Sequence, residues 1–152
     1  MSTPNLSLRQ KSSARAAAVQ VLYRAEVRGE KREADTLLKR YGEHLDALHD
    51  KDAKKLGLDA PPDKPLFAKL VETACGEAEA IESELEKLLA SDWKKARVNV
   101  LLLALLRVAL AERRLGKLAQ KPWVAEYTGL AHRFVSEQEA GFVNAALQSV
   151  HA

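Results

Sequence analysis

The stretch NVLLLALLRVALAERR, residues 99–114, decides the fold of this chain. Its apolar residues continue nearly all round a helical period, which is typical of a helix buried at the centre of a domain. Asn99 is suited to cap the start of this helix, which we expect to run from Val100 to about Arg114. Arg107 is the exception, because a buried guanidinium must reach water along its stem or meet a carboxylate.

The segments on either side of this helix also have helical patterns. The first is expected to begin at a cap, Ser12 or Ser13, and to stop at Gly29. Ser136 and Glu139 form the pattern of a capping box at the start of the last helix. The remaining helices are expected over residues 34–48, from Pro65 with a break or continuation near Gly76, over residues 81–89, and from Pro122 to Phe134.

Composition agrees with this pattern. Of 152 residues, 47% are hydrophobic but only 5% are aromatic, and the chain is rich in the straight-chain residues that favour helices. The length fits one domain. We therefore predict an all-α fold, with a flexible basic arm at residues 1–12, one helical domain over residues 13–152, and an exposed loop at residues 49–63.

Charge is unevenly distributed along the chain, although the formal net charge is only +3. Residues 1–25 carry cations and no acid, residues 91–135 are also basic, and residues 77–86 hold five glutamates. Segregated charge of this kind can present a basic face to phosphates, while the simpler interpretation is that these side chains only solvate helix surfaces.

No catalytic or metal-binding pattern is visible. Cys75 is the only cysteine, the four histidines lack metal-ligand spacing, and no glycine-rich phosphate loop occurs. Glu126 and His132 are interpreted as helix-surface or packing residues. The most apolar run is too short to span a membrane, and no secretory signal is seen. We expect a cytoplasmic protein that is not an enzyme and needs no metal or cofactor.

Four segments together resemble motifs of the NusB family. Leu105–Glu112 resembles its L-R-x-A-x-x-E helix, and Val124–Phe134 its I-N-E segment with the residues that follow. Gly141–Leu147 is similar to its terminal F-V-N motif, and Ala14–Tyr23 to its opening R-x-x-A-x-Q-x-L-Y helix. The segments follow the family's order and spacing over essentially the whole chain.

This resemblance implies a seven-helix fold of two packed bundles. It also implies binding of the boxA element of ribosomal RNA leader transcripts, together with the ribosomal protein NusE, within a transcription elongation complex. The chain would act as a monomer or homodimer.

The resemblance also implies an RNA site at the start of the first helix and the start of the last. Lys11 and Arg15 match the family's phosphate-contacting start, Phe142 its base-stacking aromatic, and Gln138 a loop position that contacts RNA. Arg9 and Arg24 are added as nearby cations. The alternatives are that Arg15 is solvated or paired with Glu26 or Glu30, and that Phe142 belongs to the core.

Three other interpretations compete with this one. The basic start is thinned here to Lys-Ser-Ser-Ala-Arg over residues 11–15, which favours a NusB-like protein scaffold with weak or no RNA binding. The chain could instead be the RNA-positioning module of a ribosomal RNA cytosine-5 methyltransferase, although no downstream catalytic domain is seen. A DNA-binding helical domain lacks support, because no helix-turn-helix spacing is found.

Overall fold

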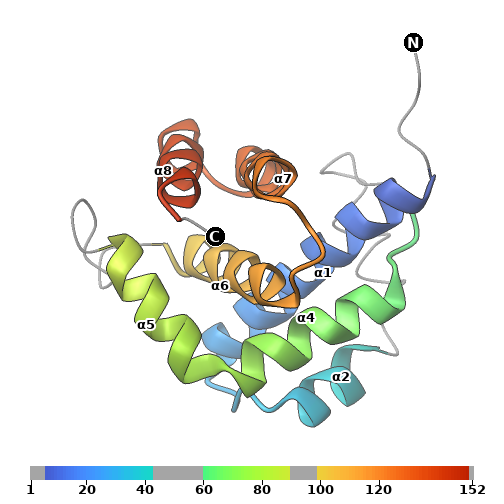
Figure 1. Cartoon of the computed structure of the whole chain (residues 1–152). Coiled ribbons are helices and arrows are strands. Elements are labelled where there is room, and N and C mark those ends of the chain that lie inside the picture. The colour runs from blue at the N-terminus through green and yellow to red at the C-terminus, as the bar shows by residue number, and fades with distance from the viewer. Residues whose placement is uncertain (1–5, 43–59, 90–98, 151–152) are drawn as a thin grey trace.

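The computed structural model describes residues 6–42, 60–89 and 99–150, and within these ranges every regular element is a helix (Figure 1). The helices are α1 (Leu6–Arg28), α2 (Ala34–Gly42), α4 (Lys64–Gly76), α5 (Ala78–Leu89), α6 (Val100–Leu115), α7 (Gln120–Phe134) and α8 (Glu137–Gln148). The predicted all-α fold class is thereby confirmed. None of the described helices has both the length and the apolar character needed to cross a membrane.

Helix α6 is the central element, as its sequence indicates. Every residue from Leu102 to Glu112 is buried, and α1, α4, α5 and α7 all pack against this helix. Its start is capped as predicted, because the Asn99 side chain accepts a hydrogen bond of 2.7 Å from the amide of Leu101. Its end is set by Gly116, whose φ of +70° lies in the left-handed region that glycine adopts without strain.

The helices form two packed groups around α6 (Figure 1). Helices α1, α2 and α4 pack on one another, whereas α5 and α7 pack on α6 and α8 packs on α7. Contacts of α1 and α4 with α6 join the two groups into one core. This arrangement agrees with the expected pair of packed bundles.

The predicted start of the first helix is wrong. Helix α1 begins at Leu6, so Ser12 and Ser13 lie inside it and cap nothing. Two tertiary contacts secure this first part of the helix: the Asp63 amide donates to the Gln10 carbonyl (2.9 Å), and the Ser12 hydroxyl donates to Glu126. Residues 6–12 of the predicted flexible arm are therefore helical, and residues 1–5 lie outside the described part of the chain.

Other boundaries fall close to their predictions. Asp63 caps α4 just before its expected start at Pro65. Of the two alternatives near Gly76, a break or a continuation, the structure has the break, which separates α4 from α5. Of the predicted exposed loop at 49–63, residues 49–59 lie outside the described ranges, and so do residues 43–48 of the predicted second helix. Ala60 and Pro62, at the end of that loop, are buried rather than exposed.

The charge of Arg107 inside the core is met by a carboxylate. Its Nε lies 2.5 Å from Oε1 of Glu82 on α5, and Arg32 approaches the same oxygen at 3.4 Å. Glu82 thus links α6 to the segment between α1 and α2. The capping box at the start of α8 is also confirmed, because Ser136 and Glu139 each accept a hydrogen bond from the other's amide.

Candidate nucleic-acid interface

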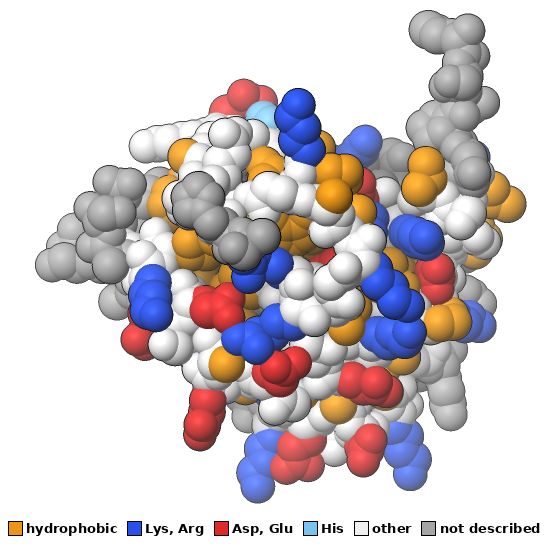
Figure 2. Space-filling model, viewed as in Figure 1, with side chains coloured by type: hydrophobic (Ala, Val, Ile, Leu, Met, Phe, Trp, Pro, Cys, Tyr) orange, Lys and Arg blue, Asp and Glu red, His pale blue; other side chains and the backbone are white. Residues whose placement is uncertain are grey.

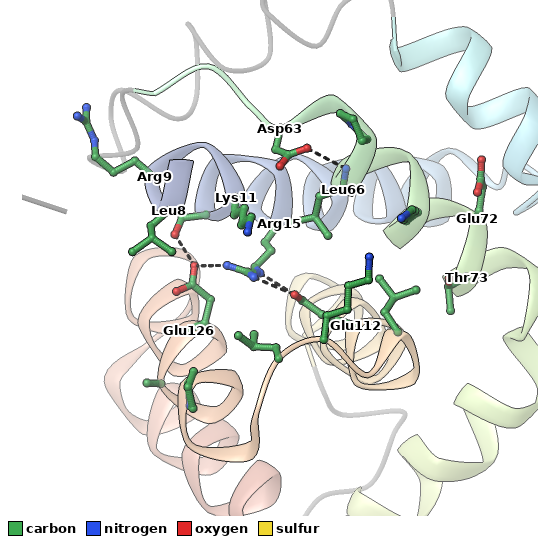
Figure 3. A pocket seen from close by; sticks show the side chains of 18 of the residues that line it. Leu8, Arg9, Lys11, Arg15, Asp63, Leu66, Glu72, Thr73, Glu112 and Glu126 are labelled. Carbon is green, nitrogen blue, oxygen red and sulfur yellow. Dashed lines mark hydrogen bonds and ion pairs between the residues drawn. The ribbon is translucent and has the colours of Figure 1, made fainter. Parts of the chain in front are cut away.

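A cavity of about 1370 Å³ opens between the start of α1, α4, the end of α6, the α6–α7 connection and α7 (Figure 3). Helix α1 contributes one stripe of side chains to it: Leu8, Lys11, Ser12 and Arg15. These positions follow the spacing i, i+3, i+4 and i+7, which places them on one face of a helix. Because α1 is helical from Leu6 onward, the predicted cations Lys11 and Arg15 both face this cavity.

Arg15 lies at the inner wall of this cavity in a buried ion pair. Its Nε and Nη2 donate to the two carboxylate oxygens of Glu112 at 2.6 and 2.8 Å, a two-pronged geometry (Figure 3). The two side chains are only 7% and 6% exposed. Burial opposes the charged form of Arg15, but the hydrogen bond and charge of Glu112 outweigh it and raise the pKa of Arg15 above its usual value.

Two residues of α7 complete this network. Nη1 of Arg15 lies 3.0 Å from Oε1 of Glu126, which also accepts from the Ser12 hydroxyl. The hydroxyl of the fully buried Tyr127 donates to Glu112 at 2.6 Å. Burial, and then the neighbouring charge of Glu112, raise the pKa of Tyr127 well above its usual value. The network ties α1 to both α6 and α7.

This geometry corrects the two expectations for Arg15 as a solvated residue or as a partner of Glu26 or Glu30. Its partners are Glu112 and Glu126, whereas Glu30 lies against Arg40 and Arg28. Glu126, interpreted from the sequence as a helix-surface charge, is partly exposed and pairs with Arg15 and Ser12. All three nitrogens of the Arg15 guanidinium face carboxylates, so Arg15 is assigned to holding α1 in place.

Other cations surround the cavity. Lys11 on α1, Lys69 on α4, Lys117 in the α6–α7 connection and Arg133 near the end of α7 all line it, together with Arg9. Among the described residues, none of the first four has an acidic partner within ion-pairing distance. Figure 2 shows Lys and Arg side chains, with some Asp and Glu among them, on the face over α1 and α4.

The sequence did not indicate that Lys69, Lys117 and Arg133 would line this cavity. The last two belong to the basic segment 91–135, so the charge distribution carried a signal for them, but it gave no sign of which elements they would face. Lys69 had no such signal. Apolar side chains, including Leu8, Leu66 and Leu118, line the cavity between these charges.

Three of the predicted RNA-contacting residues lie elsewhere. Arg24 is half-buried on α1, Gln138 is exposed on α8, and Phe142 is half-buried and packs against the core. None of the three is among the residues that line the cavity. Helix α8 packs on α7 rather than on α1, so the cavity joins the start of α1 to α4 and α7 instead of to the start of α8. Their contact with RNA stays a prediction.

Comparison with known proteins identifies the family. The family model described as "NusB family" matches residues 12–152. The chain belongs to the NusB family. It is 31% identical to the transcription antitermination protein NusB of Caulobacter vibrioides, over 94% of this chain and 93% of that protein. It is 32% identical to the protein of the same name from Granulibacter bethesdensis, over 96% and 90%.

Membership of the NusB family also bears on catalysis. The similar proteins are named for transcription antitermination rather than for an enzymatic activity, which confirms the prediction that the chain is not an enzyme. In the part of the chain that the structure describes, no group of three or more His, Cys, Asp or Glu side chains could hold a metal ion. His132 is exposed on α7, 3.6 Å from Glu137, and is not among the residues that line the cavity.

Proposed function

We propose that the protein is a transcription antitermination factor that binds single-stranded RNA, specifically the boxA element of ribosomal RNA leader transcripts, together with ribosomal protein NusE. Its relatives from Caulobacter vibrioides and Granulibacter bethesdensis are named transcription antitermination proteins, which supports the general role. The observation that carries the RNA-binding part is the cavity beside the start of α1, where cations from several parts of the fold converge.

The chemistry of the cavity fits a phosphate backbone. Lys11, Lys69, Lys117 and Arg133 supply positive charge around one opening, and single-stranded nucleic acids are held largely by such contacts. The apolar lining gives the sugars and bases a surface that excludes water. Arg9 extends this charge along α1.

In the free protein, Arg15 supports this site through its ion pairs with two carboxylates. Its ion pairs with Glu112 on α6 and Glu126 on α7 hold the stripe of α1 that carries Lys11 against both helices. Gln138 and Phe142 remain proposed contacts for bases that leave the cavity and pass over α8. We place the activity in the cytoplasm, within a transcription elongation complex.

A protein scaffold without RNA binding is the second candidate. One observation favours it: Arg15, expected to contact phosphate, is buried and occupied by carboxylates, which removes a cation from an already thin basic start. The two candidates differ in whether the chain, alone or with NusE, has affinity for RNA.

The test is a fluorescence-anisotropy titration of a labelled boxA-type RNA, with a scrambled RNA of the same composition as control. Each titration is run with and without NusE, at two salt concentrations. We expect the boxA-type RNA to bind more tightly than the scrambled RNA, NusE to strengthen binding, and added salt to weaken it. Equal binding of the two RNAs in the presence of NusE would contradict the proposal.

A further inference from the structure

We propose that Glu126 occupies, in the free protein, the position that an RNA phosphate takes when RNA enters the cavity. In this view Glu126 is a built-in competitor that RNA must displace from Arg15 and Ser12. The inference rests on the proposed RNA-binding function and names the residue that regulates access to that site.

The contacts of Glu126 are those of a bound anion. Its Oε1 lies 3.0 Å from Nη1 of Arg15 and accepts a hydrogen bond from the hydroxyl of Ser12 (Figure 3). A guanidinium N–H and a hydroxyl bind a phosphate oxygen as readily as a carboxylate oxygen. Both donors come from the stripe of α1 that also carries Lys11, so a phosphate at this point would lie beside a further cation.

The two carboxylates on Arg15 differ in how easily they can leave. The Glu112 side chain is 6% exposed and holds Arg15 through two hydrogen bonds as well as accepting from Tyr127. The Glu126 side chain is 28% exposed, lines the cavity and meets only one guanidinium nitrogen. When Glu126 leaves Arg15, its carboxylate can be solvated by the water of the cavity, while Arg15 keeps its two hydrogen bonds to Glu112. Glu126 is therefore the exchangeable partner.

The net charge around Arg15 determines which anions can displace Glu126. Glu112 already neutralises Arg15, so the group formed by Arg15, Glu112 and Glu126 carries one net negative charge at the inner wall. A single phosphate gains little by replacing one anion with another there. A strand that engages Lys11, Lys69 and Lys117 at the same time brings its phosphates close enough to compete. Glu126 thereby selects for polyanions that span the cavity.

The first variant for the test is Glu126→Gln, whose amide oxygen can still accept from Ser12 and Arg15. The matched control is Glu72→Gln, because Glu72 is an exposed carboxylate of the same cavity on α4. A second variant, Glu126→Asp, keeps the charge but shortens the side chain and so withdraws the carboxylate from Arg15. Affinity for a labelled boxA-type RNA is measured by anisotropy, and thermal unfolding is followed for each variant.

We expect Glu126→Gln to bind RNA about fivefold more tightly than the unchanged protein, which corresponds to about 1 kcal/mol. Glu72→Gln should gain at most about twofold from the loss of general repulsion. Glu126→Asp should also bind more tightly than the unchanged protein, since it weakens the competing interaction without removing charge.

Equal affinities of Glu126→Gln and Glu72→Gln, with no gain in Glu126→Asp, overturn the inference. If in that case the unchanged protein binds RNA and Lys11→Ala weakens binding, the proposed function stands and only the role of Glu126 fails. If neither the unchanged protein nor any variant binds RNA, with or without NusE, both proposals are overturned.

Discussion

The guanidinium of Arg15 and the carboxylate of Glu112 meet through two buried hydrogen bonds of 2.6 and 2.8 Å, although 97 residues separate them in the chain. This pair joins the first helix to the central one directly beneath the cavity. Removing one partner from such a pair leaves an uncompensated charge in a poorly solvated place, which is far costlier than losing a surface ion pair. The pair therefore fixes where the cations of α1 lie.

Replacing Arg15 with Ala should lower the free energy of unfolding by about 3–5 kcal/mol, because Glu112 would remain buried and charged. Glu112→Ala should lower the free energy of unfolding by a similar amount, because Arg15 would remain buried and charged without this partner. The double variant should lose less than the sum of the two, as expected for groups in direct contact. Urea denaturation measures all three. A loss below about 1 kcal/mol for Arg15→Ala would show that the pair does not hold α1.

Replacing Tyr127 with Phe should lower the free energy of unfolding by about 1–2 kcal/mol near neutral pH, since Glu112 loses a buried donor. The pKa of Tyr127 is raised above its ordinary value of 10.0 by burial and Glu112, so the folded state holds the proton more tightly than the unfolded state. The stability that this proton contributes is complete below about pH 10 and is lost as pH rises above it.

The difference in free energy of unfolding between the unchanged protein and Tyr127→Phe should therefore shrink above about pH 10. Tyr23→Phe is the control, because Tyr23 is half-buried on α1 and takes no part in the Arg15 network. Denaturation curves at several pH values give the free energy of unfolding of each protein and so measure this difference. A difference that stays constant through about pH 11 would argue against a raised pKa in the folded protein.

Replacing Lys69, Lys117 and Arg133 together with Ala should weaken RNA binding and flatten its salt dependence. Each cation that neutralises a phosphate of a single strand adds about 0.7 to the slope of log affinity against log salt, so removing three predicts a change of about 2. The control replaces Lys39 and Lys87, exposed lysines on α2 and α5 that do not line the cavity. An unchanged slope in the triple variant would place the RNA elsewhere.

Most of the fold could be predicted from the sequence because its signals are local. Asn99 caps α6, Gly29 follows the end of α1, and Ser136 with Glu139 forms a capping box, each within a few residues of the helix end it marks. The start of α1 could not be predicted in this way. It is stabilised by Asp63 and Glu126, which lie far along the chain, while Ser12 and Ser13 offered a plausible local cap.

The site was only partly predictable for a related reason. The resemblance predicts Lys11 as a phosphate contact, and Arg9 is predicted as a nearby cation; both line the cavity. The burial of Arg15 depends on α1 packing against α4 and α6, which the periodicity of one helix does not report. Lys69 reaches the cavity through the approach of α4, so no pattern within its own segment could mark it.

The most direct test of the proposed RNA site is chemical footprinting of lysines with and without a boxA-type RNA, read by mass spectrometry. We predict that RNA protects Lys11, Lys69 and Lys117, which line the cavity, and leaves the reactivity of Lys39 and Lys87 unchanged. Under saturating RNA, full reactivity of the three cavity lysines would contradict an RNA site in this cavity.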